Sequence, residues 1–156
     1  MKNLFKYLIA ISVIFLFACG GGNTKQAEQI SKPPQPKKVV DPYENWQQYH
    51  GVGPVKAFTL PADIDQELAT KGKEVYDAMC TACHKVDKKF IGPAPKDILT
   101  RRNPAWIMNM ILAPDKMILE DPIAKKLLGD FNGAPMANQN LTEEQARAIL
   151  EYFRTL

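Results

Sequence analysis

Apolar residues between positions 64 and 156 recur at the three- and four-residue spacing of helix faces, and strand-like alternation is almost absent. The first run of this kind predicts a helix over about 64–80, with Asp63 or Asp65 as its N-cap. Its apolar face is formed by Leu68, Gly72, Val75, Tyr76 and Met79. The pattern therefore predicts an all-α domain.

Two further helices are predicted from proline start signals. Asn103-Pro104 offers an N-cap followed by a first-turn proline. We expect the helix that begins there to bury Trp106, Ile107, Met110 and Ile111. Asp121-Pro122 repeats the signal, and Gly129 predicts the end of a shorter helix over about 122–128.

The last predicted helix begins at residues 142–145, Thr-Glu-Glu-Gln, which have the form of a capping box, and runs to about Thr155. Glycine- and proline-rich loops at 90–100 and 129–140 connect the helices. Short helices and long loops bury little apolar surface against the entropy of ordering the chain. We therefore expect a bound prosthetic group to complete the core.

The N-terminal 18 residues have the order of a signal peptide, because two lysines precede the 12-residue apolar run Tyr7–Ala18. A membrane-spanning helix is the alternative, but it needs roughly 20 apolar residues. The small residue before Cys19 resembles a bacterial lipobox, in which the cysteine becomes the lipidated first residue. We predict a signal peptide over 1–18 and a lipidated, Lys- and Pro-rich tether over 19–40. The protein is then anchored by lipid in the cell envelope and faces the periplasm.

Charge and length restrict the partners and the domain organisation that we expect. Removal of the signal peptide leaves 18 basic and 17 acidic residues, a net charge of +1, so nucleic acid is not expected as a partner. The length of residues 41–156 suits one small domain, with its helical part over 64–156. The preceding segment, 41–63, is interpreted as an N-terminal extension of this domain, and its pattern indicates no function.

Two of the three cysteines and one of the two histidines fall within Cys80-Thr81-Ala82-Cys83-His84. In a C-x-x-C-H motif each thiol adds to a vinyl group of haem, and the histidine that follows binds the iron. A zinc site would need four ligands, and outside the motif the chain offers only His50 and carboxylates. A thioredoxin-like dithiol would need a βαβ setting. The motif predicts one covalent haem c, with His84 as an iron ligand.

Other residues of the domain match a known family. Gly72 lies eight residues before Cys80, and Tyr76 lies four before it. With the C-x-x-C-H motif they resemble the class I monohaem cytochromes c, here of a bacterial lipoprotein type. The resemblance implies the cytochrome c fold, in which the first and last helices cross at the glycine and loops enclose the haem. An aromatic residue of the last helix packs beside the crossing, and Tyr152 matches it best.

The resemblance also implies the residues around the iron. A proline carbonyl of the family accepts a hydrogen bond from the other nitrogen of the haem histidine, and Pro93 fits that place, with Pro95 as a weaker candidate. The sixth ligand is a methionine in the loop before the last helix, where this chain has Met136. Other candidates for this position are Met110, Met117 and His50.

Methionine ligation predicts a closed, six-coordinate iron and hence a one-electron carrier rather than an enzyme. An open sixth position would indicate a haem enzyme or a gas sensor. The implied partners are a membrane quinol-oxidising complex as donor and a terminal reductase or oxidase as acceptor. Residues 101–128 also resemble small cytochromes that accompany nitrous oxide respiration.

Two sets of side chains near the motif have predicted roles. The resemblance implies candidates for contacts with the haem propionates, Arg101, Arg102 and Trp106; the alternative is a core tryptophan and a solvated basic pair. The basic residues that follow the motif, which would steer an acidic partner, are Lys85, Lys88, Lys89, Lys96, Arg101 and Arg102.

Overall fold

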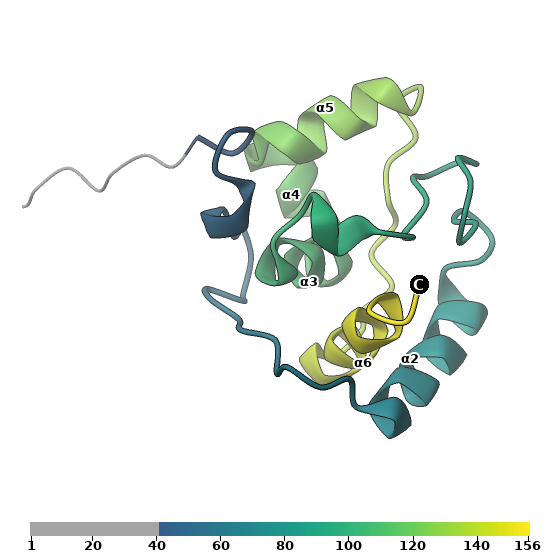
Figure 1. Ribbon diagram of the computed structural model, residues 1–156. Coiled ribbons are helices and arrows are strands. Elements are labelled where there is room, and N and C mark those ends of the chain that lie inside the picture. The colour runs from purple at the N-terminus through teal and green to yellow at the C-terminus, as the bar shows by residue number, and fades with distance from the viewer. Residues whose placement is uncertain (1–40) are drawn as a thin grey trace, which may run out of the picture. The chain divides into compact units, whose positions relative to one another are not determined.

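A computed structural model describes residues 41–156 (Figure 1). This part of the chain is helical and contains no strand, which confirms the all-α prediction. Its helices are η1 (Trp46–Gln48), α2 (Gln66–Met79), η2 (Ile98–Thr100), α3 (Pro104–Leu112), α4 (Pro114–Glu120), α5 (Pro122–Asp130) and α6 (Glu143–Phe153). The predicted signal peptide, Cys19 and the tether lie outside the described residues.

Side-chain caps fix the four helix starts that the sequence predicted. Asp65 caps α2 by accepting a hydrogen bond from the Leu68 N–H, and Asn103 and Asp121 cap α3 and α5 in the same way. Thr142 and Gln145 form the expected capping box at α6. These caps satisfy backbone donors that a helix start leaves without partners, so they fix where each helix begins.

Three details of the helix prediction were wrong. Helix α4 was not predicted; Pro114 occupies its first turn, and Met117 lies within it. Gly129 does not end α5, which continues to Asp130. Met110 was expected to be buried, but it is only half-buried, while Met108 and Asn109 are buried instead.

Helices α2 and α6 cross in close contact, as the family resemblance implied, and Figure 1 shows them packed together. A Cβ added to Gly72 would lie 1.9 Å from the carbonyl oxygen of Ala148, so only glycine permits this approach. The rings of Tyr76 and Tyr152 lie 5.4 Å apart beside the crossing. The predicted crossing and its aromatic contact are thus confirmed.

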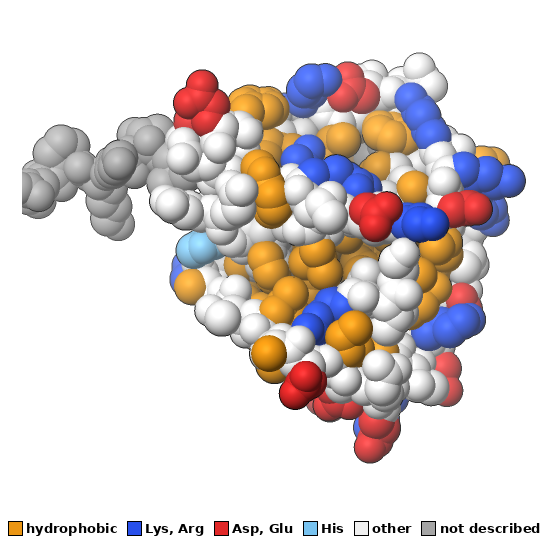
Figure 2. Space-filling view, in the orientation of Figure 1, with side chains coloured by type: hydrophobic (Ala, Val, Ile, Leu, Met, Phe, Trp, Pro, Cys, Tyr) orange, Lys and Arg blue, Asp and Glu red, His pale blue; other side chains and the backbone are white. Residues whose placement is uncertain are grey.

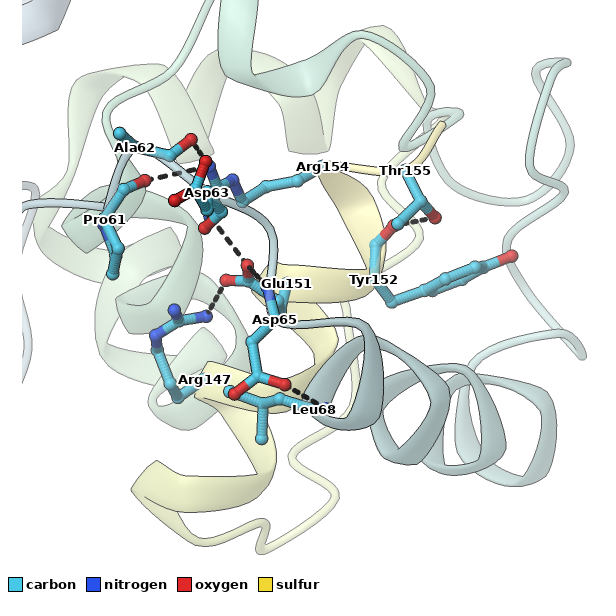
Figure 3. Close-up of polar contacts among 10 residues, drawn as sticks. All are labelled: Pro61, Ala62, Asp63, Asp65, Leu68, Arg147, Glu151, Tyr152, Arg154 and Thr155. Carbon is cyan, nitrogen blue, oxygen red and sulfur yellow. Dashed lines mark hydrogen bonds and ion pairs between the residues drawn. The ribbon is translucent and has the colours of Figure 1, made fainter.

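A buried carboxylate fastens α6 to the start of α2 (Figure 3). Glu151 has no exposed surface, and its Oε1 accepts hydrogen bonds from the Asp65 N–H at 2.8 Å and from Arg154 at 2.6 Å. Its other oxygen forms an ion pair with Arg147. Burial acts to raise the pKa of Glu151, but the Asp65 N–H and the two guanidiniums outweigh it and hold the pKa below its usual value.

The segment before α2 packs on the same core. Arg154 donates hydrogen bonds to the three successive carbonyl oxygens of residues 61–63. Further upstream, the fully buried Asn109 of α3 accepts a hydrogen bond from the Val55 N–H and donates to the carbonyl oxygens of Val55 and His50. The Val52 N–H donates to the sulfur of Met117 in α4. Residues 50–63 therefore cover α3, α4 and α6.

Candidate functional site

A cavity of about 220 Å³ lies within the described domain and is walled by all five α-helices and the loops between them. Its lining is largely apolar and includes Ile98, Ile107, Ile111, Leu127, Ile149 and Phe153. The residues that the sequence predicted to bind the cofactor all line it: Cys80, Cys83, His84, Pro93 and Met136. Hydrophobic side chains gather at the centre of the face in Figure 2, with Lys and Arg side chains above and to its right.

The imidazole of His84 is oriented by the loop that follows it. Its Nδ1 lies 2.8 Å from the carbonyl oxygen of Pro93, so Nδ1 carries the proton and donates it, and the Nε2 lone pair is available to a metal. Gly92 makes this approach possible, because a Cβ there would lie 2.4 Å from the imidazole Cε1. The carbonyl oxygen of Pro95 instead accepts a hydrogen bond from the Ile98 N–H.

The two cysteines lie on the turn that ends α2. The N–H groups of Cys83 and His84 both donate to the carbonyl oxygen of Cys80, which brings the motif into one compact turn. Both thiols are free. Burial, followed by the nearby Cys83, raises the pKa of the Cys80 thiol to about 11, in keeping with an apolar cavity wall. Cys83 is exposed and therefore lies where the cavity meets the surface.

The methionines differ in their access to the cavity. Met136, in the loop between α5 and α6, and Met110, on α3, both line it. Met117 is fully buried and accepts a hydrogen bond from the Val52 N–H, so its sulfur belongs to the core under the N-terminal extension. His50 lies in that extension as well, where Asn109 holds its backbone. Of the alternatives to Met136, Met110 is the one that faces the cavity.

The predicted propionate contacts Arg101, Arg102 and Trp106 also line the cavity. Arg101 donates hydrogen bonds to the carbonyl oxygens of Ala94 and Lys96, and the guanidinium of Arg102 lies 5.3 Å from the centre of the Trp106 ring. The indole N–H of Trp106 donates to the buried carboxylate of Asp121 at 3.3 Å. Sequence reasoning identified Asp121 only as a helix cap and missed this contact.

The residues present fit a covalently held haem. Two free thiols, an imidazole with its Nε2 available and a thioether meet in one apolar cavity, which is the donor set of a methionine-ligated haem c. Within residues 41–156 no cluster of three His, Cys, Asp or Glu side chains could hold a metal ion, which argues against the zinc alternative. The same residues contain no strand for a thioredoxin-like βαβ unit.

Comparison with known proteins agrees with this fit. Residues 69–156 match the family model for cytochrome c. Cytochrome c-551 of Ectopseudomonas mendocina is 30% identical over 86 residues, covering 54% of this chain and 96% of its own. Cytochrome c-552 of Nitrosomonas europaea is 31% identical over 100 residues, covering 61% and 81%.

Solved structures give the same result. The cytochrome c from Rhodothermus marinus superposes with a TM-score of 0.64 and 48% identity, covering 66% of this chain and 88% of that one. These homologues are bacterial monohaem class I cytochromes with one covalently bound haem c. The chain described here therefore belongs to the cytochrome c family.

Proposed function

We propose that this protein is a membrane-tethered electron carrier of the periplasm, which passes single electrons through its haem c. The observation that carries the proposal is the His84 imidazole, held by the Pro93 carbonyl oxygen in an apolar cavity that Met136 also lines. Bound haem supplies the change between ferric and ferrous iron. Cys80 and Cys83 would hold it through thioethers, and His84 and Met136 would ligate the iron.

Attachment to the membrane is proposed from the sequence, through Cys19. Among residues 41–156, no helix has the length and hydrophobicity that crossing a membrane requires. The proposed anchor is a lipid on the Cys19 sulfur, followed by a tether that leaves the haem domain in the periplasm. Lipid anchorage would keep the carrier near a membrane quinol-oxidising complex, the proposed donor.

Replacing Cys19 by serine should release the protein from the membrane, because the acyl chains have no sulfur to attach to. The measurement is fractionation of cells that express the full chain, with haem absorbance followed in the salt-washed membranes and in the soluble periplasmic fraction. The parent should remain with the membranes and Cys19→Ser should not. A variant that stays in washed membranes would show that the leader is an uncleaved anchor.

The mouth of the cavity offers a docking face for the acceptor, proposed to be a terminal reductase or oxidase. Met79 and Ile91 line the cavity and are also 44% and 47% exposed, so the cavity reaches the surface at these residues. Lys85, Lys88 and Lys89 belong to the same loop. Lys85 lies over the Phe90 ring. Lys88 and Lys89 are both exposed, but Lys89 lies over Phe131 and donates to the Asp130 carbonyl oxygen, whereas no such contact is found for Lys88 within the described part of the chain. A basic rim around an apolar mouth suits an acidic partner.

Reversing the charge of Lys88 should slow electron delivery to the native acceptor at low salt, with spectrum and potential unchanged. The expected loss is about tenfold in association rate, and it should fade at high salt because exposed charges are screened over about 8 Å at physiological ionic strength. Stopped-flow oxidation of the reduced protein measures the rate. The matched control is Lys116→Glu, an exposed lysine of α4. Equal slowing by both variants would show that the basic rim does not steer the acceptor specifically.

A further inference from the structure

Asp121 is a fully buried carboxylate with an incomplete set of hydrogen bonds. Its Oδ1 accepts two, from Trp106 Nε1 at 3.3 Å and from the Ala124 N–H at 2.8 Å. Its Oδ2 has no hydrogen bond of good geometry among the described residues, although the Tyr49 hydroxyl lies beside the carboxylate. Capping of α5 accounts for one of these contacts, and an exposed cap would serve that purpose equally well. Neither the helix cap nor the proposed ligand set explains why the carboxylate is buried.

The carboxylate lies directly behind the wall of the haem cavity. Both of its donors, Trp106 and Ala124, line that cavity, whereas Asp121 itself does not. The buried negative charge is therefore one hydrogen bond away from each of two residues in the cavity wall. Charges in a poorly solvated interior interact much more strongly than charges at the surface.

The other charged or titratable groups around Asp121 come from three segments. Tyr49 follows η1; burial, and then the Asp121 carboxylate beside it, raises the pKa of its hydroxyl. Arg102 precedes α3 and lines the cavity; burial and the neighbouring Arg101 lower the pKa of its guanidinium, while Asp121 acts to raise it. Tyr43 donates a hydrogen bond from its hydroxyl to the carbonyl oxygen of Pro122. Arg102 thus places a positive charge over the Trp106 ring, and Asp121 places a negative charge against the indole N–H of the same side chain.

We propose that Asp121 tunes the reduction potential of the haem, its buried negative charge stabilising the ferric state and lowering the potential. When one electron converts ferric to ferrous iron, the positive charge of the site falls by one, and no bond to Asp121 forms or breaks. A negative charge behind the cavity wall favours the more positive, oxidised form. Arg102, which lines the cavity, acts in the opposite sense, so the two charges that contact Trp106 together set the balance.

The test is the midpoint potential of holo Asp121→Asn, measured at an electrode without a partner protein. Asparagine keeps the Oδ1 acceptor for Trp106 and the cap of α5, so the charge is removed while the fold is retained. The expected result is a shift to higher potential at neutral pH.

The matched control is Glu120→Gln, the preceding carboxylate, which is exposed. Its shift should be much smaller because solvent screens it. Equal potentials for Asp121→Asn and the parent, a shift to lower potential, or equal shifts in both variants would overturn the inference. The inference rests on the proposed function only through the change in oxidation state of the haem. A parent without a reversible one-electron couple would overturn both, whereas a normal couple that Asp121→Asn leaves unmoved overturns the inference alone.

Discussion

Met136→Ala should retain covalent haem but lose the sixth iron ligand, and its reduced form should then bind carbon monoxide readily. The haem is retained because Cys80, Cys83 and His84 belong to a separate turn after α2, which Met136 does not support. Met136 lies in the loop between α5 and α6, where the hydrogen bond from the Asn140 N–H to Asn138 Oδ1 is the only one found to residues 135–139 within the described structure. The iron–sulfur bond is therefore expected to order this loop, and its loss should leave the site open.

The expected changes are a lower reduction potential and loss of the far-red band of methionine-bound ferric haem. Visible spectra, an electrochemical titration and carbon monoxide binding at neutral pH measure them. The parent should bind little carbon monoxide. Rapid binding to the parent would favour the haem enzyme or gas sensor over the electron carrier.

Met110→Leu is the matched control, because Met110 also lines the cavity and leucine keeps its apolar volume. It should keep the far-red band and the potential close to those of the parent. If the far-red band survived in Met136→Ala and vanished in Met110→Leu, the sixth iron ligand would be Met110 of α3 and not Met136.

The sequence predicts this domain best where the signal is local. A cap and its helix lie within three residues of each other, so Asn103, Asp121 and Thr142 could be identified without tertiary information, and the cap of α2 was narrowed to Asp63 or Asp65. The C-x-x-C-H motif is similarly local, because one turn of chain brings Cys80, Cys83 and His84 to the cavity. Gly72 was identified through the family resemblance. The structure adds its contact partner, the backbone of Ala148, which leaves no room for a Cβ.

Features that depend on contacts between distant segments could not be predicted. Nothing in the sequence around Asn109 indicates that it holds the backbone of residues 50–55, since its partners lie 54 and 59 positions away. In the sequence, Glu151 is one of several charged residues of the last helix. Its burial depends on the Asp65 N–H, which lies 86 positions away. The buried position of Asp121 behind the cavity likewise depends on the packing of α3 against α4 and α5, which periodicity does not specify.

Gly72→Ala should destabilise the protein severely, because the crossing of α2 and α6 has no room for a methyl group. The added Cβ would lie 1.9 Å from the carbonyl oxygen and 2.3 Å from the carbonyl carbon of Ala148. Both atoms are backbone, so no side-chain rotation relieves the overlap and the helices must separate. Overpacking costs about 1–3 kcal/mol where side chains can adjust, and we expect a loss of at least about 3 kcal/mol here.

Separation of the helices would also disturb the cavity, since Tyr76 of α2 and Ile149 and Phe153 of α6 line it. The measurements are the free energy of unfolding of the haem-loaded protein in denaturant and the yield of covalent haem. Gly129→Ala is the matched control: Gly129 lies within α5, and its Cβ would meet nothing within 4 Å. That variant should gain about 0.5–1 kcal/mol from higher helix propensity. If Gly72→Ala were as stable as Gly129→Ala, the close crossing of α2 and α6 would not explain why position 72 is glycine.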